Sequence, residues 1–182
     1  MRIISGKYAK RNLFTLKSRK TRPTSDKVKE SLFNSLGQFF NGETVLDLYA
    51  GSGALGIEAV SRGCSKATLV DINYAAVEII KKNVALTKDE QKFSVYKIPS
   101  RVALKKFADK NLKFDLVFLD PPYAKQKIVL DMKNMLKLDL LSEHAVVVAE
   151  TDDETQLDPV SGFKLIKDHH LGKTIVRIYQ KV

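Results

Sequence analysis

Four consecutive residues, Asp120-Pro121-Pro122-Tyr123, follow an apolar run at 116–119. Two adjacent prolines lack N–H donors and fix their own φ angles, so they predict a strand that ends in a stiff loop. This loop offers the Asp120 carboxylate and the Pro121 carbonyl as acceptors, with the Tyr123 ring beside them. Such a set is suited to hold the exocyclic amino group of a nucleobase while the aromatic ring stacks on the base.

This arrangement predicts transfer of an electrophilic group to a base amine. An exocyclic amine is a poor nucleophile because its lone pair is delocalised into the ring. Acceptors that bind both N–H groups hold the nitrogen closer to a tetrahedral shape. Positioning and fixed dipoles would therefore provide most of the catalysis. The amines of guanine, adenine and cytosine are equally compatible with this chemistry, and proline pairs also occur in ordinary turns.

A glycine-rich segment forms the second candidate site. Gly51, Gly53 and Gly56 follow an apolar stretch at 44–49, in the spacing of a dinucleotide-binding loop between a strand and a helix. Asp71 ends the next apolar stretch, about 20 residues after the first glycine. There its carboxylate could accept hydrogen bonds from both hydroxyl groups of a ribose. Glycines in this pattern also occur at close strand–helix crossings without any ligand.

The glycine pattern alone allows either NAD or S-adenosylmethionine as the cofactor. Asp47 precedes the loop and favours S-adenosylmethionine, because a carboxylate there could orient the loop or meet a cationic amino-acid moiety but would repel a pyrophosphate. The base-amine site also requires a methyl donor and not a hydride acceptor. We also expect no second domain of the size that usually carries the substrate of a dehydrogenase.

Positive charge is concentrated at the N-terminus. The net charge is +10, and residues 1–30 hold ten basic side chains against two acidic ones. This distribution predicts a surface that contacts the phosphates of a nucleic acid. Tyr8 and Phe14 lie between the charges and could stack on unpaired bases. The candidate contact residues are Arg2, Lys7, Arg11, Arg19, Lys20, Arg22 and Thr24.

The composition predicts a single globular α/β domain over residues 1–182, with a basic hairpin extension at 1–22 and a core at 23–182. A lone cysteine, Cys64, fits a reducing cytosol, and we expect a cytoplasmic protein without a secretory signal or a membrane span. The three histidines lack the spacing of a metal site, so no metal is expected. Nothing in the sequence demands more than a monomer.

Alternating apolar patterns predict a Rossmann-like, doubly wound sheet that is mostly parallel and seven-stranded. Gly51, Asp71 and Asp120 each follow a strand end, so all three should meet at one edge of the sheet. The amphipathic helix at 25–40 should end at Asn41-Gly42. The other expected helices lie near 54–62, 74–87, 101–109 and 125–138, the strands near 44–49, 67–71, 93–97, 115–119 and 145–150, and antiparallel hairpins at 1–16 and 163–179.

Beyond these patterns, the chain resembles the RsmD family of bacterial small-subunit ribosomal RNA methyltransferases over nearly its whole length. The matching segments are Met1-Arg2-Ile3-Ile4-Ser5-Gly6-Lys7, residues 21–30, residues 45–59 and residues 114–123. The resemblance implies a class I, S-adenosylmethionine-dependent enzyme that methylates the exocyclic N2 of a guanine, position 966, in 16S rRNA of the small ribosomal subunit or its assembly intermediate.

The resemblance also implies roles for individual residues. Asp120, Pro121, Pro122 and Tyr123 would grip the guanine, and Arg22, Pro23 and Thr24 would border the active site, with the basic hairpin on the rRNA. The stretch at 97–101 lacks the acidic or amide residue that similar proteins use for the adenine, which leaves Ser100 as the candidate. The expected cofactor-binding residues are Asp47, Ala50, Gly51, Ser52, Gly53, Asp71, Ile72 and Ser100.

Two other functions fit the same residues. A DNA or RNA methyltransferase acting on adenine N6 or cytosine N4 would use the same acceptors. An RNA-binding assembly factor without turnover would keep the fold and the basic N-terminus, although the intact Asp120 and glycine loop argue against it. An NAD-dependent dehydrogenase is the weakest interpretation.

Overall fold

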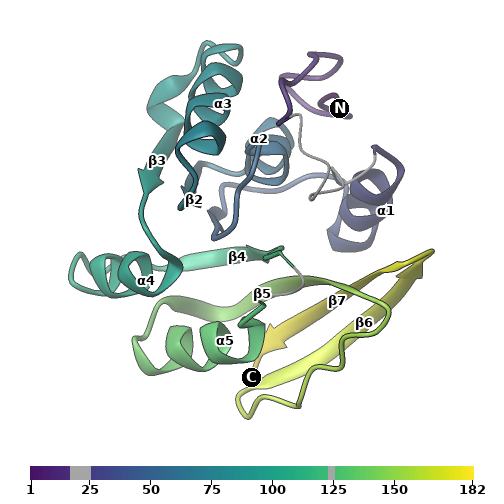
Figure 1. The fold of residues 1–182 in the computed structure, drawn as a ribbon, viewed down its shortest axis with the longest axis vertical. Helices are drawn as coiled ribbons and strands as arrows, with labels where there is room; N and C mark the ends of the chain where they lie inside the picture. Colours follow the sequence, from purple (N-terminus) through teal and green to yellow (C-terminus); the bar gives the residue numbers. More distant parts are fainter. Residues whose placement is uncertain (17–25, 123–125) are drawn as a thin grey trace.

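The computed structural model describes residues 1–16, 26–122 and 126–182. At its centre is a seven-stranded sheet with the strand order β3-β2-β1-β4-β5-β7-β6 (Figure 1). The first five strands are parallel, and β7 runs antiparallel between β5 and β6. The predicted doubly wound sheet and the C-terminal hairpin are therefore confirmed. The strands are β1 (Thr44–Asp47), β2 (Lys66–Asp71), β3 (Phe93–Lys97), β4 (Phe114–Leu119), β5 (Leu141–Asp152), β6 (Phe163–Leu171) and β7 (Thr174–Lys181).

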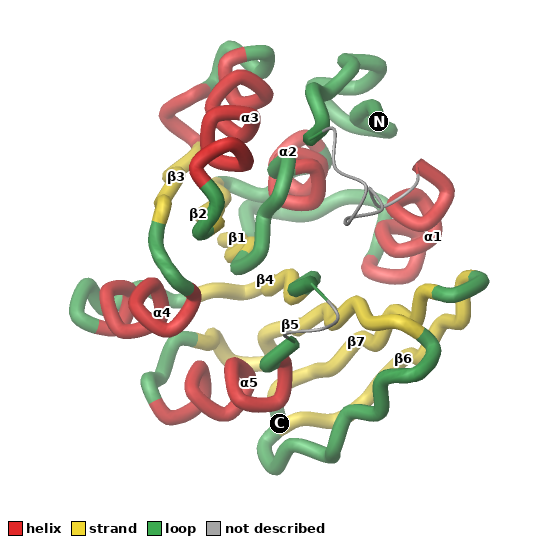
Figure 2. Tube along the Cα trace, viewed as in Figure 1, coloured by secondary structure: helices red, strands yellow, loops and turns green. Residues whose placement is uncertain are grey.

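Helices cover both faces of the sheet (Figure 2). They are α1 (Asp26–Leu36), α2 (Ala54–Ser61), α3 (Tyr74–Ala85), α4 (Ser100–Ala108) and α5 (Ile128–Lys137), with a short 3₁₀ turn η1 at Glu90–Lys92. The side chains of α1, α2 and α3 pack in one core and those of α4 and α5 in another, because successive strand residues point to opposite faces. Within the described residues, no helix is both long enough and apolar enough to cross a bilayer.

Helix α1 is shorter than the amphipathic pattern predicted. It ends at Leu36 because Gly37 adopts a φ of 115°, a left-handed conformation that stops a helix and that glycine tolerates best. Phe39 is therefore 65% exposed and not part of the core face. Phe40 turns back so that its ring meets that of Phe33 edge-on, at 6.2 Å between centroids. The prediction that the helix continues to Asn41-Gly42 was wrong.

The N-terminal segment folds back on itself and packs on α2 and α3. Its antiparallel pairing is limited to one bridge between Arg2 and Asn12, so it is a hairpin-like turn and not an extended ladder. Gly6 lies so close to α2 that a Cβ there would come within 1.8 Å of the carbonyl oxygen of Ser61. Ile3 and Tyr8 are fully buried. Residues 1–16 therefore form part of the folded body.

Candidate active site

Three predicted site residues meet where the parallel strands end, and we call this side of the sheet the carboxyl edge. Asp47 is the last residue of β1, Asp71 is the last residue of β2, and Asp120 directly follows β4. Strand β1 pairs in parallel with both β2 and β4, with Asp47 opposite Leu69 and Phe118. Because the three strands run in the same direction side by side, these three residues lie at the same edge of the sheet.

The three glycines of the loop between β1 and α2 have different tasks. Gly51 and Gly53 adopt φ angles of 55° and 78°. A Cβ on Gly51 would meet no atom within 4 Å, so this part of the loop borders open space. A Cβ on Gly56 would lie 2.3 Å from Leu69 Cδ2, so this glycine permits the close crossing of α2 over β2. The loop therefore combines a close strand–helix crossing with a backbone that a ligand can approach.

Asp71 holds the glycine loop in place through its carboxylate. Its Oδ2 accepts a hydrogen bond from Gly51 N at 2.9 Å, and its Oδ1 accepts one from Asn73 N at 2.8 Å. Partial burial raises the pKa of Asp71, and the backbone N–H groups oppose that rise. The neighbouring Ile72 is 69% exposed, so it presents an apolar side chain at the carboxyl edge.

Asp47 has one of the two roles that its position suggested. It is 1% exposed, and its Oδ2 accepts a hydrogen bond from Gly56 N at 3.2 Å. The carboxylate therefore orients the start of α2. Burial raises the pKa of Asp47 to about 7, and the nearby charges of Asp120 and Asp71 act in the same direction. Carboxyl groups that gather in this way suit a cationic ligand and would repel a pyrophosphate.

Asn83 links the glycine loop to the N-terminal segment. Its Nδ2 donates to the carbonyl oxygen of Ser52 at 2.8 Å and to that of Phe14 at 2.9 Å, while its Oδ1 accepts from Phe14 N at 2.8 Å. The side chain is fully buried within α3. An asparagine at a core-facing position of a helix was the only sign of this role in the sequence, and it was missed.

Ser100, the candidate adenine contact, belongs to a hydrogen-bonded group at the start of α4. The Tyr49 hydroxyl lies 3.2 Å from Ser100 Oγ and donates to Asp131 Oδ2 at 2.5 Å. Asp131 is 3% exposed on α5, and burial raises its pKa. Neither Tyr49 nor Asp131 was predicted, although a carboxylate on the apolar face of an amphipathic helix is an unusual feature that could have signalled such a partner.

The proline motif ends β4 as predicted. The strand stops at Leu119, Asp120 is half-buried, Pro121 is buried and Pro122 is exposed. Burial raises the pKa of Asp120. Tyr123 lies outside the described residues, as do Arg19, Lys20, Arg22 and Thr24.

A second carboxyl group, which was not predicted, lies beside Asp120. Strands β4 and β5 pair in parallel with Phe118 opposite Val148 and Leu119 opposite Ala149, and the same register continued by one residue would bring Asp120 opposite Glu150. Glu150 is 7% exposed. Burial raises its pKa, and the charge of Asp120 raises it further. The glutamate directly follows the apolar run at 145–149 within β5, a position that resembles those of Asp71 and Asp120 in the sequence.

The N-terminal cations are partly used within the protein. Lys7 Nζ lies 2.6 Å from Asp89 Oδ2, and Arg11 donates to the carbonyl oxygen of Leu86 at 2.6 Å. Tyr8 is fully buried and donates to Asp89 at 2.7 Å, so the prediction that its ring stacks on bases was wrong. Two of the predicted RNA contacts remain exposed. The side chain of Arg2 is 63% exposed, and Phe14 is 52% exposed.

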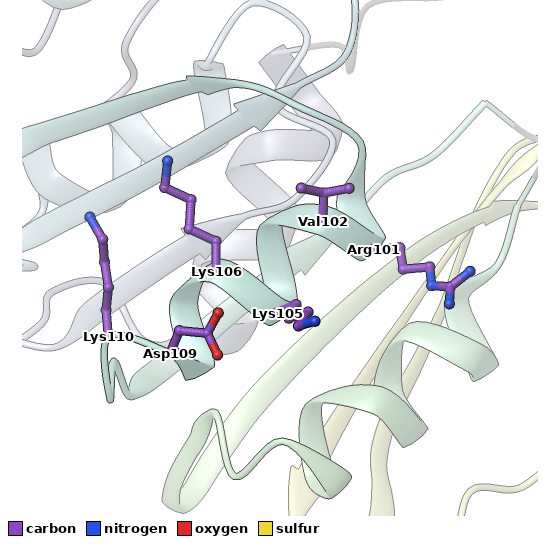
Figure 3. Close-up of a pocket in the computed structure, with 6 residues that line it drawn as sticks. All are labelled: Arg101, Val102, Lys105, Lys106, Asp109 and Lys110. Carbon is purple, nitrogen blue, oxygen red and sulfur yellow. The ribbon is translucent and has the colours of Figure 1, made fainter.

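Helix α4, which begins at Ser100, presents a second basic surface (Figure 3). A shallow depression of about 460 Å³ is lined by Arg101, Val102, Lys105, Lys106, Asp109 and Lys110. Its four cations are exposed, and none forms an ion pair within the described part of the chain. We call these four residues the α4 cations.

Comparisons with known proteins place this geometry in a family. The family model described as "Conserved hypothetical protein 95" matches residues 1–180. The chain is 39% identical to YlbH of Bacillus subtilis over 100% of this chain and 99% of that protein. It is 34% identical to Ribosomal RNA small subunit methyltransferase D of Haemophilus influenzae over 99% of this chain and 93% of that protein. The chain belongs to the RsmD family.

A solved structure supports the same relationship. The RsmD-family chain is similar to a conserved hypothetical protein of Streptococcus pyogenes, with a TM-score of 0.81 and 42% sequence identity. The similarity covers 85% of this chain and 96% of that one. The class I methyltransferase fold of this RsmD-family member is therefore supported by its strand order and by its structural neighbours.

Proposed function

We propose that this protein is an S-adenosylmethionine-dependent methyltransferase that modifies the exocyclic N2 of a guanine in 16S rRNA. The observation that carries this proposal is the meeting of the Asp120-Pro121 acceptors with the glycine loop and Asp71 at the carboxyl edge. The name of the Haemophilus influenzae relative, a small-subunit rRNA methyltransferase, supports the choice of substrate.

The residues of the carboxyl edge fit this cofactor. Asp71 has carboxylate oxygens for the ribose hydroxyls, and the open space at Gly51 leaves room for the amino-acid part. Burial raises the pKa of the nearby Asp47, and a bound cation would favour the ionised form of this carboxyl group. The exposed side chain of Ile72 and the start of α4 at Ser100 would border the adenine. When bound, the cofactor supplies a methyl group on a positively charged sulfur.

Asp120 and the Pro121 carbonyl would act on the amine nitrogen. Each accepts a hydrogen bond from one N–H group of the amine, so the nitrogen lone pair is directed towards the methyl group. Once the cofactor has supplied its methyl group, the amine nitrogen would carry a positive charge and become acidic. Its proton can pass to Asp120, because burial raises the pKa of this carboxyl group and so favours its protonated form.

The RNA would meet basic surfaces on both sides of the site. Arg2 on the N-terminal segment lies 3.6 Å from Asp26 but keeps 63% of its side chain exposed, and the exposed α4 cations begin one residue after Ser100. Exposed cations of this kind bind phosphates without reading sequence. Lys7 and Arg11 contribute less to this surface than the sequence suggested, because they already bind Asp89 and the carbonyl oxygen of Leu86.

The proposal is tested by methyl transfer from labelled S-adenosylmethionine to small ribosomal subunits from cells that lack this gene. Incorporation of about one methyl group per subunit by the wild-type protein, and none by Asp120→Ala, supports it. Tight cofactor binding without methyl incorporation into subunits, assembly intermediates or free 16S rRNA contradicts it and favours a binding role.

A further inference from the structure

Glu150 lies on the same face of the sheet as Asp120. Parallel pairing joins Phe118 to Val148 and Leu119 to Ala149, and side chains alternate between the faces along each strand. Phe118 and Val148 belong to the core beneath α1, so the side chains two residues later, those of Asp120 and Glu150, point to that same side. Neighbouring strands lie about 4.8 Å apart, which brings the two carboxyl groups next to each other.

Glu150 is largely removed from water but has no partner. The residue is only 7% exposed, and its side chain makes no hydrogen bond or ion pair within residues 1–16, 26–122 and 126–182. The cation on the adjacent strand is used elsewhere, since Arg177 lies 3.7 Å from Asp168 Oδ2 and donates to Thr151 Oγ1 at 3.1 Å. A carboxyl group in such a place is unfavourable for stability.

The Glu150 carboxyl group is nevertheless open to a ligand. In the described part of the chain, every fully buried polar side-chain atom has a hydrogen-bond partner. Because Glu150 has none, its oxygens keep a small contact with solvent. The register of β4 on β5 and the effect of the Asp120 charge on Glu150 place these oxygens near Asp120.

We propose that Glu150 accepts a hydrogen bond from N1–H of the target guanine while Asp120 accepts one from its N2 amine. The inference rests on the proposed function and names the residue that selects the base. Guanine carries these two donors side by side, whereas the amines of adenine and cytosine stand next to a ring nitrogen without hydrogen. Two adjacent carboxyl groups match the guanine pattern, and a base without the ring N–H gives Glu150 no donor to bind.

The test replaces the target guanine by 2-aminopurine, which keeps the N2 amine and lacks N1–H. Splinted ligation introduces the analogue into 16S rRNA, which is then reconstituted into small subunits. The readout is the ratio of kcat/KM for guanine to that for 2-aminopurine. We expect the wild-type protein to prefer guanine by roughly 10- to 100-fold, the discrimination of one good base contact. Glu150→Leu should reduce the ratio to about 1–3, and Glu150→Gln, which keeps an acceptor oxygen, should retain an intermediate preference.

Glu143→Leu is the matched control, because Glu143 lies on the same strand at the far end and its side chain is 92% exposed. Cofactor binding and thermal unfolding establish that each variant is folded. If Glu150→Leu does not fold, the ratio measured for Glu150→Gln decides the outcome. An unchanged ratio in a folded Glu150 variant, or a wild-type protein without preference, overturns the inference. A wild-type protein that methylates neither base instead contradicts the proposed function itself.

Discussion

The ammonium group of Lys29 lies 3.0 Å from the carboxylate of Glu58, and both side chains are fully buried. The same carboxylate binds Arg62 at 2.8 Å and accepts hydrogen bonds from the backbone N–H groups of Ile4 and Ser5 at 2.8 and 3.0 Å. One acidic side chain of α2 therefore joins α1 and the N-terminal segment to the core. The segment that borders the carboxyl edge depends on this buried cluster for its position.

Glu58→Ala should strongly destabilise the protein. The variant leaves two buried cations without their partner, and breaking a buried pair in this way costs about 3–5 kcal/mol. Urea unfolding monitored by circular dichroism measures the loss, with Glu30→Ala on the exposed side of α1 as the control. A loss below about 1 kcal/mol, the value for an exposed pair, would contradict the structural role given to Glu58.

Asp120→Ala should abolish methyl transfer while leaving cofactor affinity within about threefold, because the side chain is assigned to the base and not to the cofactor. Single-turnover kinetics and calorimetric binding of S-adenosylhomocysteine measure the two effects. Asp120→Asn keeps one acceptor oxygen and should retain a small residual rate. If Asp120→Ala instead lost cofactor binding, the assignment of this residue to the base would be wrong.

Asp47 should make the protein less stable as the pH rises. Burial raises its pKa from 3.8 to about 7, so the folded protein binds a proton that the unfolded chain releases. The free energy of unfolding therefore falls between about pH 4 and pH 7, by roughly 1.4 kcal/mol per pH unit for one such group. Asp47→Asn should remove this share of the slope, as measured by urea unfolding across that range. An identical slope in the variant would show that Asp47 does not hold the proton.

Neutralising three of the α4 cations should weaken RNA binding and flatten its salt dependence. For Lys105→Gln, Lys106→Gln and Lys110→Gln combined, we expect the slope of log affinity against log salt to fall by about 2–3, as for three lost phosphate contacts. Filter binding of 16S rRNA across a salt series measures the slope. The control replaces three other exposed lysines, Lys66, Lys133 and Lys137, and should leave it nearly unchanged. Equal slopes for both triple variants would exclude α4 from the RNA surface.

The sequence predicted those features that depend on local patterns. Alternating apolar runs located the strands, and the proline pair correctly ended β4 before Asp120. The convergence of Gly51, Asp71 and Asp120 was predicted from parallel topology alone, because each of the three stands at or just after a strand end. Helix α1 was extended too far because its apolar pattern continues beyond Gly37, whose left-handed backbone decides where the helix stops.

The features that were missed depend on contacts between distant segments. Lys7 and Tyr8 were assigned to RNA from their composition, but both bind Asp89, which is 82 and 81 positions away. The pairing of Asp120 with Glu150 requires the register of β4 on β5, which a single strand does not encode. Local charge counts therefore overestimated how many N-terminal cations remain free for a partner.

The most direct test of the proposed function is nucleoside analysis of small ribosomal subunits that have been methylated by this protein with radiolabelled S-adenosylmethionine. The subunits come from cells lacking the gene, so that the target site is unmodified. Our account predicts that the label is found in N2-methylguanosine at a single site of 16S rRNA. Label in N6-methyladenosine or N4-methylcytidine would contradict it, because the enzyme would then act on a base without the donor pair assigned to Asp120 and Glu150.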